Sequence, residues 1–167
     1  MSSNTLLLTA FVVTFCSGCT TAQERLEKLG AEIEVGERGE ITKVSFSDTQ
    51  VTDAGLAHLE GLRSLSWLRC DHTEVTDAGL AHLEGLTSLQ MLSLGNTQIT
   101  DAGLVHLSGL ASLQWLGLQG AQITDAGLAH LEELTSLKYL ELDNTQVTDA
   151  GVEKLKEVMP GISILRD

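Results

Sequence analysis

Along most of this chain, hydrophobic and polar positions repeat in a fixed order: a short stretch with a two-residue period is followed by one with a helical period. Within residues 65–70, Leu68 and Cys70 alternate with polar or aromatic residues, which is the two-residue period of a short strand with one buried face. About ten residues later, Leu80 and Leu83 are spaced as on one face of a short helix. The pattern therefore predicts a unit made of one strand, a turn and one helical segment.

This unit recurs at a constant spacing of 24 residues. The string TDAGLAHLEGL occupies residues 52–62 and recurs without change at residues 76–86. The aspartates that keep this step are Asp53, Asp77, Asp101, Asp125 and Asp149, and the glycines are Gly55, Gly79, Gly103, Gly127 and Gly151. A recurring string indicates a structural unit whose copies stack, because a catalytic site is single and asymmetric.

Three positions of the string carry local expectations. The Thr76 hydroxyl is expected to accept from early N–H groups of its helix, and Asp77 to favour that helix through its dipole. Gly79 lowers helix propensity, so its recurrence indicates a packing reason: a side chain there would push stacked units apart.

The strand blocks read LSWLRCDHTEV (65–75), LQMLSLGNTQI (89–99), LQWLGLQGAQI (113–123) and LKYLELDNTQV (137–147). This pattern, L-x-x-L-x-L-x-x-(N/C)-x-L, resembles the leucine-rich repeat family over about residues 41 to 167, and most closely its cysteine-containing subclass and tandem bacterial variants. The resemblance implies an α/β solenoid, a short horseshoe with parallel strands on one face and helices on the other. Thr replaces the usual Asn or Cys at Thr49, Thr73, Thr97 and Thr145, where its hydroxyl can still bond the turn, whereas Ala121 cannot.

Both ends of the stack need caps, because one unit cannot bury both of its faces. Residues 22–48 are predicted to form an N-terminal cap: an amphipathic helix over 22–30, then a hairpin whose second strand is Ile41–Phe46. Residues 49–167 are predicted to hold five tandem repeats and a C-terminal cap. Pro160 and Gly161 should end the last helix, and the charges of Arg166 and Asp167 should protect the last strand edge.

Residues 1–21 have the features of a signal peptide. The apolar run over 6–15 is too short to span a bilayer as a mature helix, and no charged residue precedes Glu24. Ser17-Gly18-Cys19 resembles the bacterial lipobox, which implies cleavage before Cys19 and its lipidation. The alternative is ordinary cleavage near residues 20–22, giving a soluble exported protein. Membrane association is therefore predicted only through a lipid anchor at Cys19.

Charge and motif content exclude several functions. The formal net charge of −13 repels phosphate backbones, so no nucleic-acid partner is predicted. No phosphate-binding loop, GxSxG or HExxH motif is present, so we predict no catalytic residues and no cofactor. The column of His58, His82, His106 and His130 should be spread along a line, whereas zinc needs ligands that converge on a point, so no metal site is predicted. Cys70 is expected to be a small buried hydrophobe.

The residues that point outward from the strands differ between repeats, so the repeat pattern does not determine them. The first column holds Trp67, Met91, Trp115 and Tyr139, and with strands about 4.8 Å apart it should form one stripe about 14 Å long. Because Trp, Tyr and Arg are common interface anchors, this face is predicted to bind a protein partner. The predicted binding residues are Trp67, Arg69, Asp71, Met91, Trp115, Gln119, Tyr139, Glu141 and Asp143, with the charged members orienting the partner at the rim.

Two other functions remain open. The near identity of the repeats also suits a structural or spacer component of the cell envelope without a ligand, because a tuned interface usually needs repeats that differ. Intracellular members of the cysteine-containing subclass recognise substrates for ubiquitin ligases, but that role needs an adaptor segment where this chain has the predicted signal.

Mass spectrometry of the mature N-terminus tests the predicted export. We expect the first residue to be Cys19 with a diacylglyceryl group. An N-terminus near residues 20–22 would indicate free secretion, and an intact Met1 would place the protein in the cytoplasm and contradict the signal.

Overall fold

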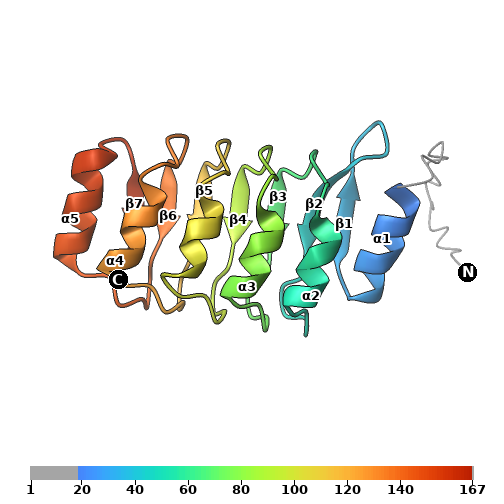
Figure 1. The fold of residues 1–167 in the computed structure, drawn as a ribbon, viewed down its shortest axis with the longest axis horizontal. Helices are drawn as coiled ribbons and strands as arrows, with labels where there is room; N and C mark the ends of the chain where they lie inside the picture. The colour runs from blue at the N-terminus through green and yellow to red at the C-terminus, as the bar shows by residue number, and fades with distance from the viewer. Residues whose placement is uncertain (1–18, 167) are drawn as a thin grey trace, which may run out of the picture.

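The protein is an elongated stack of strand–turn–helix units in the computed structural model, which describes residues 19–166 (Figure 1). A 7-stranded sheet in the order β1-β2-β3-β4-β5-β6-β7 forms one face, and the helices cover the other. Strands β1 and β2 are antiparallel, and every later pair is parallel. The predicted α/β solenoid is therefore confirmed.

The elements are short, and each repeat contributes one strand and one helical segment. The strands are β1 (Glu32–Val35), β2 (Ile41–Ser45), β3 (Trp67–Arg69), β4 (Met91–Ser93), β5 (Trp115–Gly117), β6 (Tyr139–Glu141) and β7 (Ser163–Leu165). The α-helices are α1 (Cys19–Lys28), α2 (Asp53–Leu56), α3 (Asp77–Leu80), α4 (Asp125–Leu128) and α5 (Asp149–Val158). The 3₁₀ segments are η1 (Ala57–Leu59), η2 (Ala81–Leu83), η3 (Gly103–Leu107) and η4 (Ala129–Leu131).

One continuous aliphatic core lies between the sheet and the helices. Leu68 and Cys70 point inward from the β3 segment, and Leu80 and Leu83 point inward from the helical side, all fully buried as predicted. Burial, together with the charge of Asp71, raises the pKa of the Cys70 thiol far above its usual range, so Cys70 stays a neutral core residue.

The threonines that replace the usual Asn or Cys each bond the turn after the strand. The hydroxyls of Thr73 and Thr97 donate to the carbonyls of Cys70 and Leu94 at 2.7 and 2.6 Å, and Thr49 and Thr145 repeat this contact. Ala121 keeps only the backbone bond from its N–H to the Leu118 carbonyl, at 3.0 Å. The predicted role of these threonines is confirmed.

The aspartate column joins one repeat to the next, which differs from the expectation that each Asp serves its own helix. The Asp53 carboxylate accepts from the Thr76 N–H at 2.8 Å and from the Thr76 hydroxyl at 2.7 Å. The same pair of bonds joins Asp77 to Thr100, Asp101 to Thr124 and Asp125 to Thr148. The Thr76 hydroxyl accepts no bond from its own helix, so the predicted cap is wrong at this residue. The equivalent Thr124 and Thr148 hydroxyls donate to the preceding aspartate and also accept from the first turn of their own helices.

This contact between the aspartate of one repeat and the threonine of the next, which we call the joint, also explains the glycines of the column from Gly79 onward. A Cβ on Gly79 would lie closer than 3.0 Å to Asp53 Oδ1, and a Cβ on Gly103 would lie equally close to Asp77 Oδ1. Gly127 and Gly151 face the aspartate of the preceding repeat in the same way. The prediction that a side chain here would separate stacked units is confirmed, and the group it would displace is the carboxylate of the preceding repeat.

Different elements cap the two ends of the stack. At the N-terminal end, helix α1 buries Leu26, and the hairpin β1–β2 opens the sheet. At the C-terminal end, α5 ends at Val158 just before Pro160, and β7 follows. Arg166 does not simply place charge on the sheet edge, because its guanidinium donates to the Val147 carbonyl at 2.6 Å and to the Asp149 carboxylate. In the earlier repeats the aspartate is bonded by a threonine of the next repeat, and Arg166 takes this place for Asp149.

The predicted signal peptide lies almost wholly outside the described residues. Helix α1 begins at Cys19 and so includes three residues assigned to the signal, but the side chain of Cys19 is not described, and its lipidation stays a prediction. Among the helices of residues 19–166, none has the length and apolar character needed to cross a bilayer.

We predict that Gly103→Ala lowers the free energy of unfolding by about 1–3 kcal/mol, the usual cost of forcing extra atoms into a packed site. The added methyl group would displace the Asp77 carboxylate from Thr100. Gly109→Ala is the matched control, because a Cβ there meets nothing within 4 Å. Urea denaturation of the three proteins measures the effect, and equal losses for both variants would contradict the explanation.

We also predict that the joint at Asp125 weakens in acid. The Thr148 N–H, then the Thr148 hydroxyl and the charge of Arg166 hold the pKa of Asp125 below its ordinary value. A carboxyl whose pKa is lowered on folding stabilises the folded state above its unfolded pKa, about 3.9, and loses this contribution as the pH falls through the folded pKa. The difference in unfolding free energy between wild type and Asp125→Asn should thus be constant near neutrality and shrink below about pH 4. A difference independent of pH down to pH 2 would rule out this role.

Candidate functional site

The open face of the sheet carries the predicted aromatic residues side by side. Trp67 pairs with Met91 in the register of β3 and β4, Met91 with Trp115 in β4 and β5, and Trp115 with Tyr139 in β5 and β6. We call these four residues the aromatic column. Three of them are half-buried and Tyr139 is 51% exposed. The predicted alignment of the column is confirmed by this register.

Two adjoining cavities run along this face, and together we call them the strand-face groove. One, of about 400 Å³, is lined by the whole aromatic column together with Lys43, Ser66, Gln90 and Gln114. The other, of about 510 Å³, is lined by Glu32, Ile33, Glu34, Lys43, Ser45, Trp67 and Arg69. Lys43 and Trp67 belong to both, so the groove extends from the N-terminal hairpin to β6.

The middle of the face is held by a buried carboxylate. Asp71 is 2% exposed, and its oxygens bond Arg69 Nε at 2.6 Å, the Ser93 hydroxyl at 2.5 Å and the Gly95 N–H at 2.8 Å. Asp71 was predicted to orient a partner at the rim, but its oxygens already serve three groups of this chain and its side chain is covered. It fixes the Arg69 guanidinium instead, and the exposed Arg69 side chain remains able to contact a partner.

The Trp115 ring occupies space that is free because residue 117 is a glycine. A Cβ on Gly117 would lie 2.6 Å from the Trp115 ring, so the ring lies over this glycine. Glu141 lies on the adjacent strand, paired in register with Gly117. Burial raises the pKa of Glu141 above its ordinary value, and the nearby charges of Asp143 and Asp71 raise it further, while the Trp115 side chain partly offsets this.

Gln119, also predicted to bind, lies back over the preceding strand. Its amide occupies the space above Gly95, and its Oε1 is buried without a hydrogen-bond partner. Asp143 follows β6, two residues after Glu141, and is half-buried. The predicted binding residues therefore lie on one continuous face. Two of them contact other residues of this chain: Asp71 is buried and hydrogen-bonded, and Gln119 packs over Gly95.

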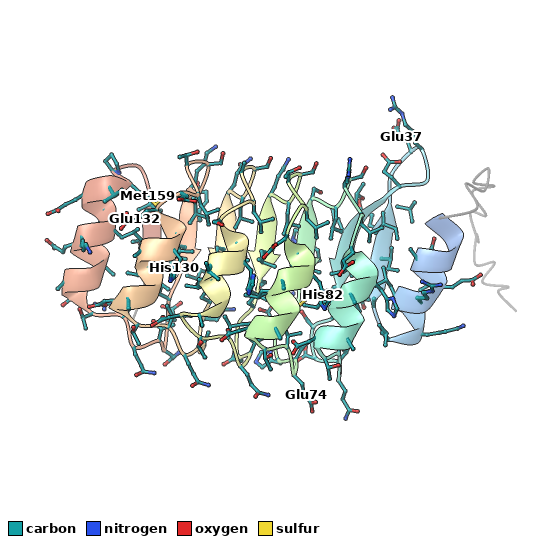
Figure 2. All side chains as sticks on the ribbon, viewed as in Figure 1. Glu37, Glu74, His82, His130, Glu132 and Met159 are labelled. Carbon is teal, nitrogen blue, oxygen red and sulfur yellow. The ribbon has the colours of Figure 1, made fainter. Side chains whose placement is uncertain are left out.

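Two histidines on the helix side contact a glutamate of the preceding repeat. His82 Nδ1 lies 2.5 Å from Glu60 Oε1, and His106 Nδ1 lies 2.6 Å from Glu84 Oε1. Figure 2 shows His82 and His130 on this side, at separate positions along the length of the stack. In the part of the chain that the structure describes, no three His, Cys, Asp or Glu side chains are grouped to hold a metal ion.

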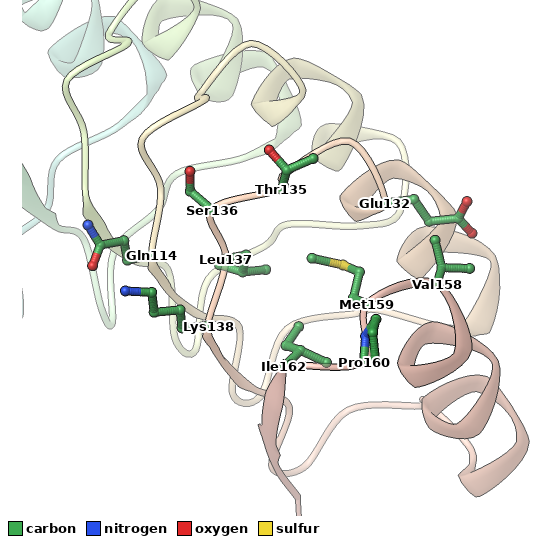
Figure 3. A pocket seen from close by; sticks show the side chains of 11 residues that line it. Gln114, Glu132, Thr135, Ser136, Leu137, Lys138, Val158, Met159, Pro160 and Ile162 are labelled. Carbon is green, nitrogen blue, oxygen red and sulfur yellow. The ribbon is translucent and has the colours of Figure 1, made fainter.

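A third cavity, of about 600 Å³, was not predicted from the sequence (Figure 3). It lies at the C-terminal turn, where Leu137, Met159 and Ile162 form apolar walls beside Lys138 and Glu132. It forms because α5 runs to Val158 and the short segment through Pro160 replaces the longer turn of the earlier repeats. The replacement of the repeat's usual turn by MPG was the only signal in the sequence.

The fold and its period define a class of protein built from stacked leucine-rich units. Two family models, both described as leucine-rich repeat, match residues 63–123 and 133–156. The chain is therefore a leucine-rich repeat protein, and leucine-rich repeats generally mediate protein–protein interactions.

Solved structures show the same fold. Internalin C2 from Listeria monocytogenes is 31% identical with a TM-score of 0.64, over 76% of this chain and 52% of that one. A leucine-rich repeat protein from Leptospira interrogans is 23% identical with a TM-score of 0.50, over 65% and 27%. This chain thus spans about half of the internalin chain. No curated protein sequence matches it significantly.

Proposed function

We propose that this protein is a non-enzymatic binding module that recognises a protein partner through the strand-face groove. The observation that carries the proposal is the aromatic column, which lines one cavity across β3 to β6 and stays partly exposed. Exposed apolar area arranged in one patch, rather than scattered, is typical of a protein–protein interaction site. Trp67, Trp115 and Tyr139 supply its anchors, since such rings bury a large area with few rotatable bonds.

Charged side chains at the edge of the column would orient the partner. Arg69 is held by Asp71 and exposed, and Glu141 is half-buried beside Tyr139 on the same strand. Fixed charges lose little conformational freedom on binding, so they contribute to specificity at low cost. The repeated joints keep the strands in register, so recognition would use a rigid surface rather than one that rearranges.

We further propose that the protein acts outside the cytoplasm. The proposal rests on the signal-like composition of residues 1–21 and on the resemblance of Ser17-Gly18-Cys19 to a lipobox. If Cys19 is lipidated, helix α1 would follow the anchor directly, and the solenoid would be held close to a membrane surface.

Replacement of both Trp67 and Trp115 by Ala tests the binding site. The two rings are only half-buried and outside the aliphatic core, so the folded state should survive while capture of a stoichiometric partner from the cell-envelope fraction drops by at least about tenfold. The matched control is Val105→Ala with Val158→Ala, which removes exposed apolar area from the helix side. Circular dichroism checks the fold of both double variants.

Unchanged capture by the Trp67→Ala, Trp115→Ala variant would remove the aromatic column from the binding site. Failure of the wild-type protein to capture any partner would instead favour a spacer role in the envelope.

A further inference from the structure

The two ends of the strand-face groove differ in how their charged side chains are paired. At its N-terminal end, Lys43 Nζ lies 2.8 Å from Glu34 Oε2, and Arg69 Nε lies 2.6 Å from Asp71 Oδ2. Both cations of this end are therefore neutralised by carboxylates of the same chain. A paired charge attracts an anion less than a free one does, so Arg69 can orient a partner at this end without giving the end a strong preference for an anionic ligand.

A half-buried carboxylate lies next to the opposite end of the groove. Glu141 is on β6 two residues after Tyr139, which lines the groove, and therefore on the same face of the sheet. Among residues 19–166, no lysine or arginine forms an ion pair with Glu141. Its raised pKa has the same origin, because partial burial and two nearby carboxylates oppose its charge without a cation to offset them. A cation brought by a ligand would relieve this imbalance.

Aromatic rings flank this carboxylate. Trp115 and Tyr139 are direct partners in the register of β5 and β6, and neighbouring strands lie about 4.8 Å apart. A cation near Glu141 would then lie within the range of about 6 Å at which a ring face attracts an ammonium or guanidinium group. One carboxylate beside two rings is a combination that suits a cationic side chain better than a neutral one.

The length of the groove indicates what carries the cation. From Lys43 on β2 to Tyr139 on β6 the lining residues cross four strand spacings, or about 19 Å. This is the length of about six residues of extended chain and exceeds any single small cation. The formal net charge of −13 would also steer a basic segment toward the protein.

We propose that the strand-face groove binds an extended protein segment whose lysine or arginine side chain lies between Trp115 and Tyr139 and pairs with Glu141. This inference rests on the proposed function and adds the chemistry of the partner. The apolar half of the segment lies over Trp67 and Met91, and its cationic side chain occupies the β5–β6 end.

Display of random hexapeptides between glycine linkers supplies the probe. The full chain is used for selection, and enriched peptides are synthesised and titrated while tryptophan fluorescence is recorded. Trp67 and Trp115 are the only tryptophans in the sequence, so the signal reports on the groove itself. We expect enriched peptides to share one Lys or Arg. Replacing that residue with norleucine or citrulline should weaken binding about tenfold or more, the effect of losing one charge-assisted contact.

Glu141→Gln tests the receptor side of the contact. The size and shape of the side chain are kept while the negative charge is lost, so peptide affinity should fall by about tenfold. Glu157→Gln on α5 makes the same change of net charge on the helix side and should leave affinity within about twofold, since exposed charges at a distance are screened by salt.

Two outcomes separate this inference from the proposed function. Peptides without a basic residue that change the fluorescence and bind Glu141→Gln as tightly as wild type would overturn the cationic partner but keep the groove as a binding site. No enrichment would remove both, and so would peptides whose affinity for the Trp67→Ala, Trp115→Ala variant equals that for wild type when both are measured by titration calorimetry, because this variant contains no tryptophan.

Discussion

The solenoid depends on the contact between each aspartate and the threonine that opens the next helical segment. The Asp53 carboxylate takes two hydrogen bonds from Thr76, and the missing side chain of Gly79 gives it room to reach the backbone. The string TDAGL is thus both halves of a connector: its threonine and glycine receive the preceding repeat, and its aspartate reaches the following one. This is why the string is copied so closely, since a change in either half would leave the other without its partner.

The connector also determines where the sequence is free to vary. Because it fixes the TDAGL string, and the leucines fix the core, variation between repeats falls on exposed positions, and the outward strand positions include those that line the strand-face groove. The aromatic column, Arg69 and Glu141 occupy those positions. The strand face therefore holds the specific chemistry of the molecule, and the helix side holds its mechanical continuity.

Most of the fold could be predicted from the sequence, because period and alternation determine which residues meet. The 24-residue spacing places Trp67, Met91 and Trp115 in register without any knowledge of coordinates. Contacts between side chains of different repeats could not be predicted in the same way. The direction of Asp53 toward Thr76, and the burial of Asp71 beneath Arg69 and Ser93, depend on rotamers and on the space left by glycines in the neighbouring strand. The cavity beside Met159 depends on how the last helix ends, which no periodic rule describes.

The identity of the joints has a consequence for how such a molecule changes over generations. Asp77 meets Thr100 by the same contacts that join Asp101 to Thr124, so a whole unit copied or deleted within the gene would find a matching neighbour on either side. The length of the open face can thus change in steps of one strand spacing, about 4.8 Å, while the caps at both ends stay the same. Selection could then tailor each new unit through a few outward side chains alone.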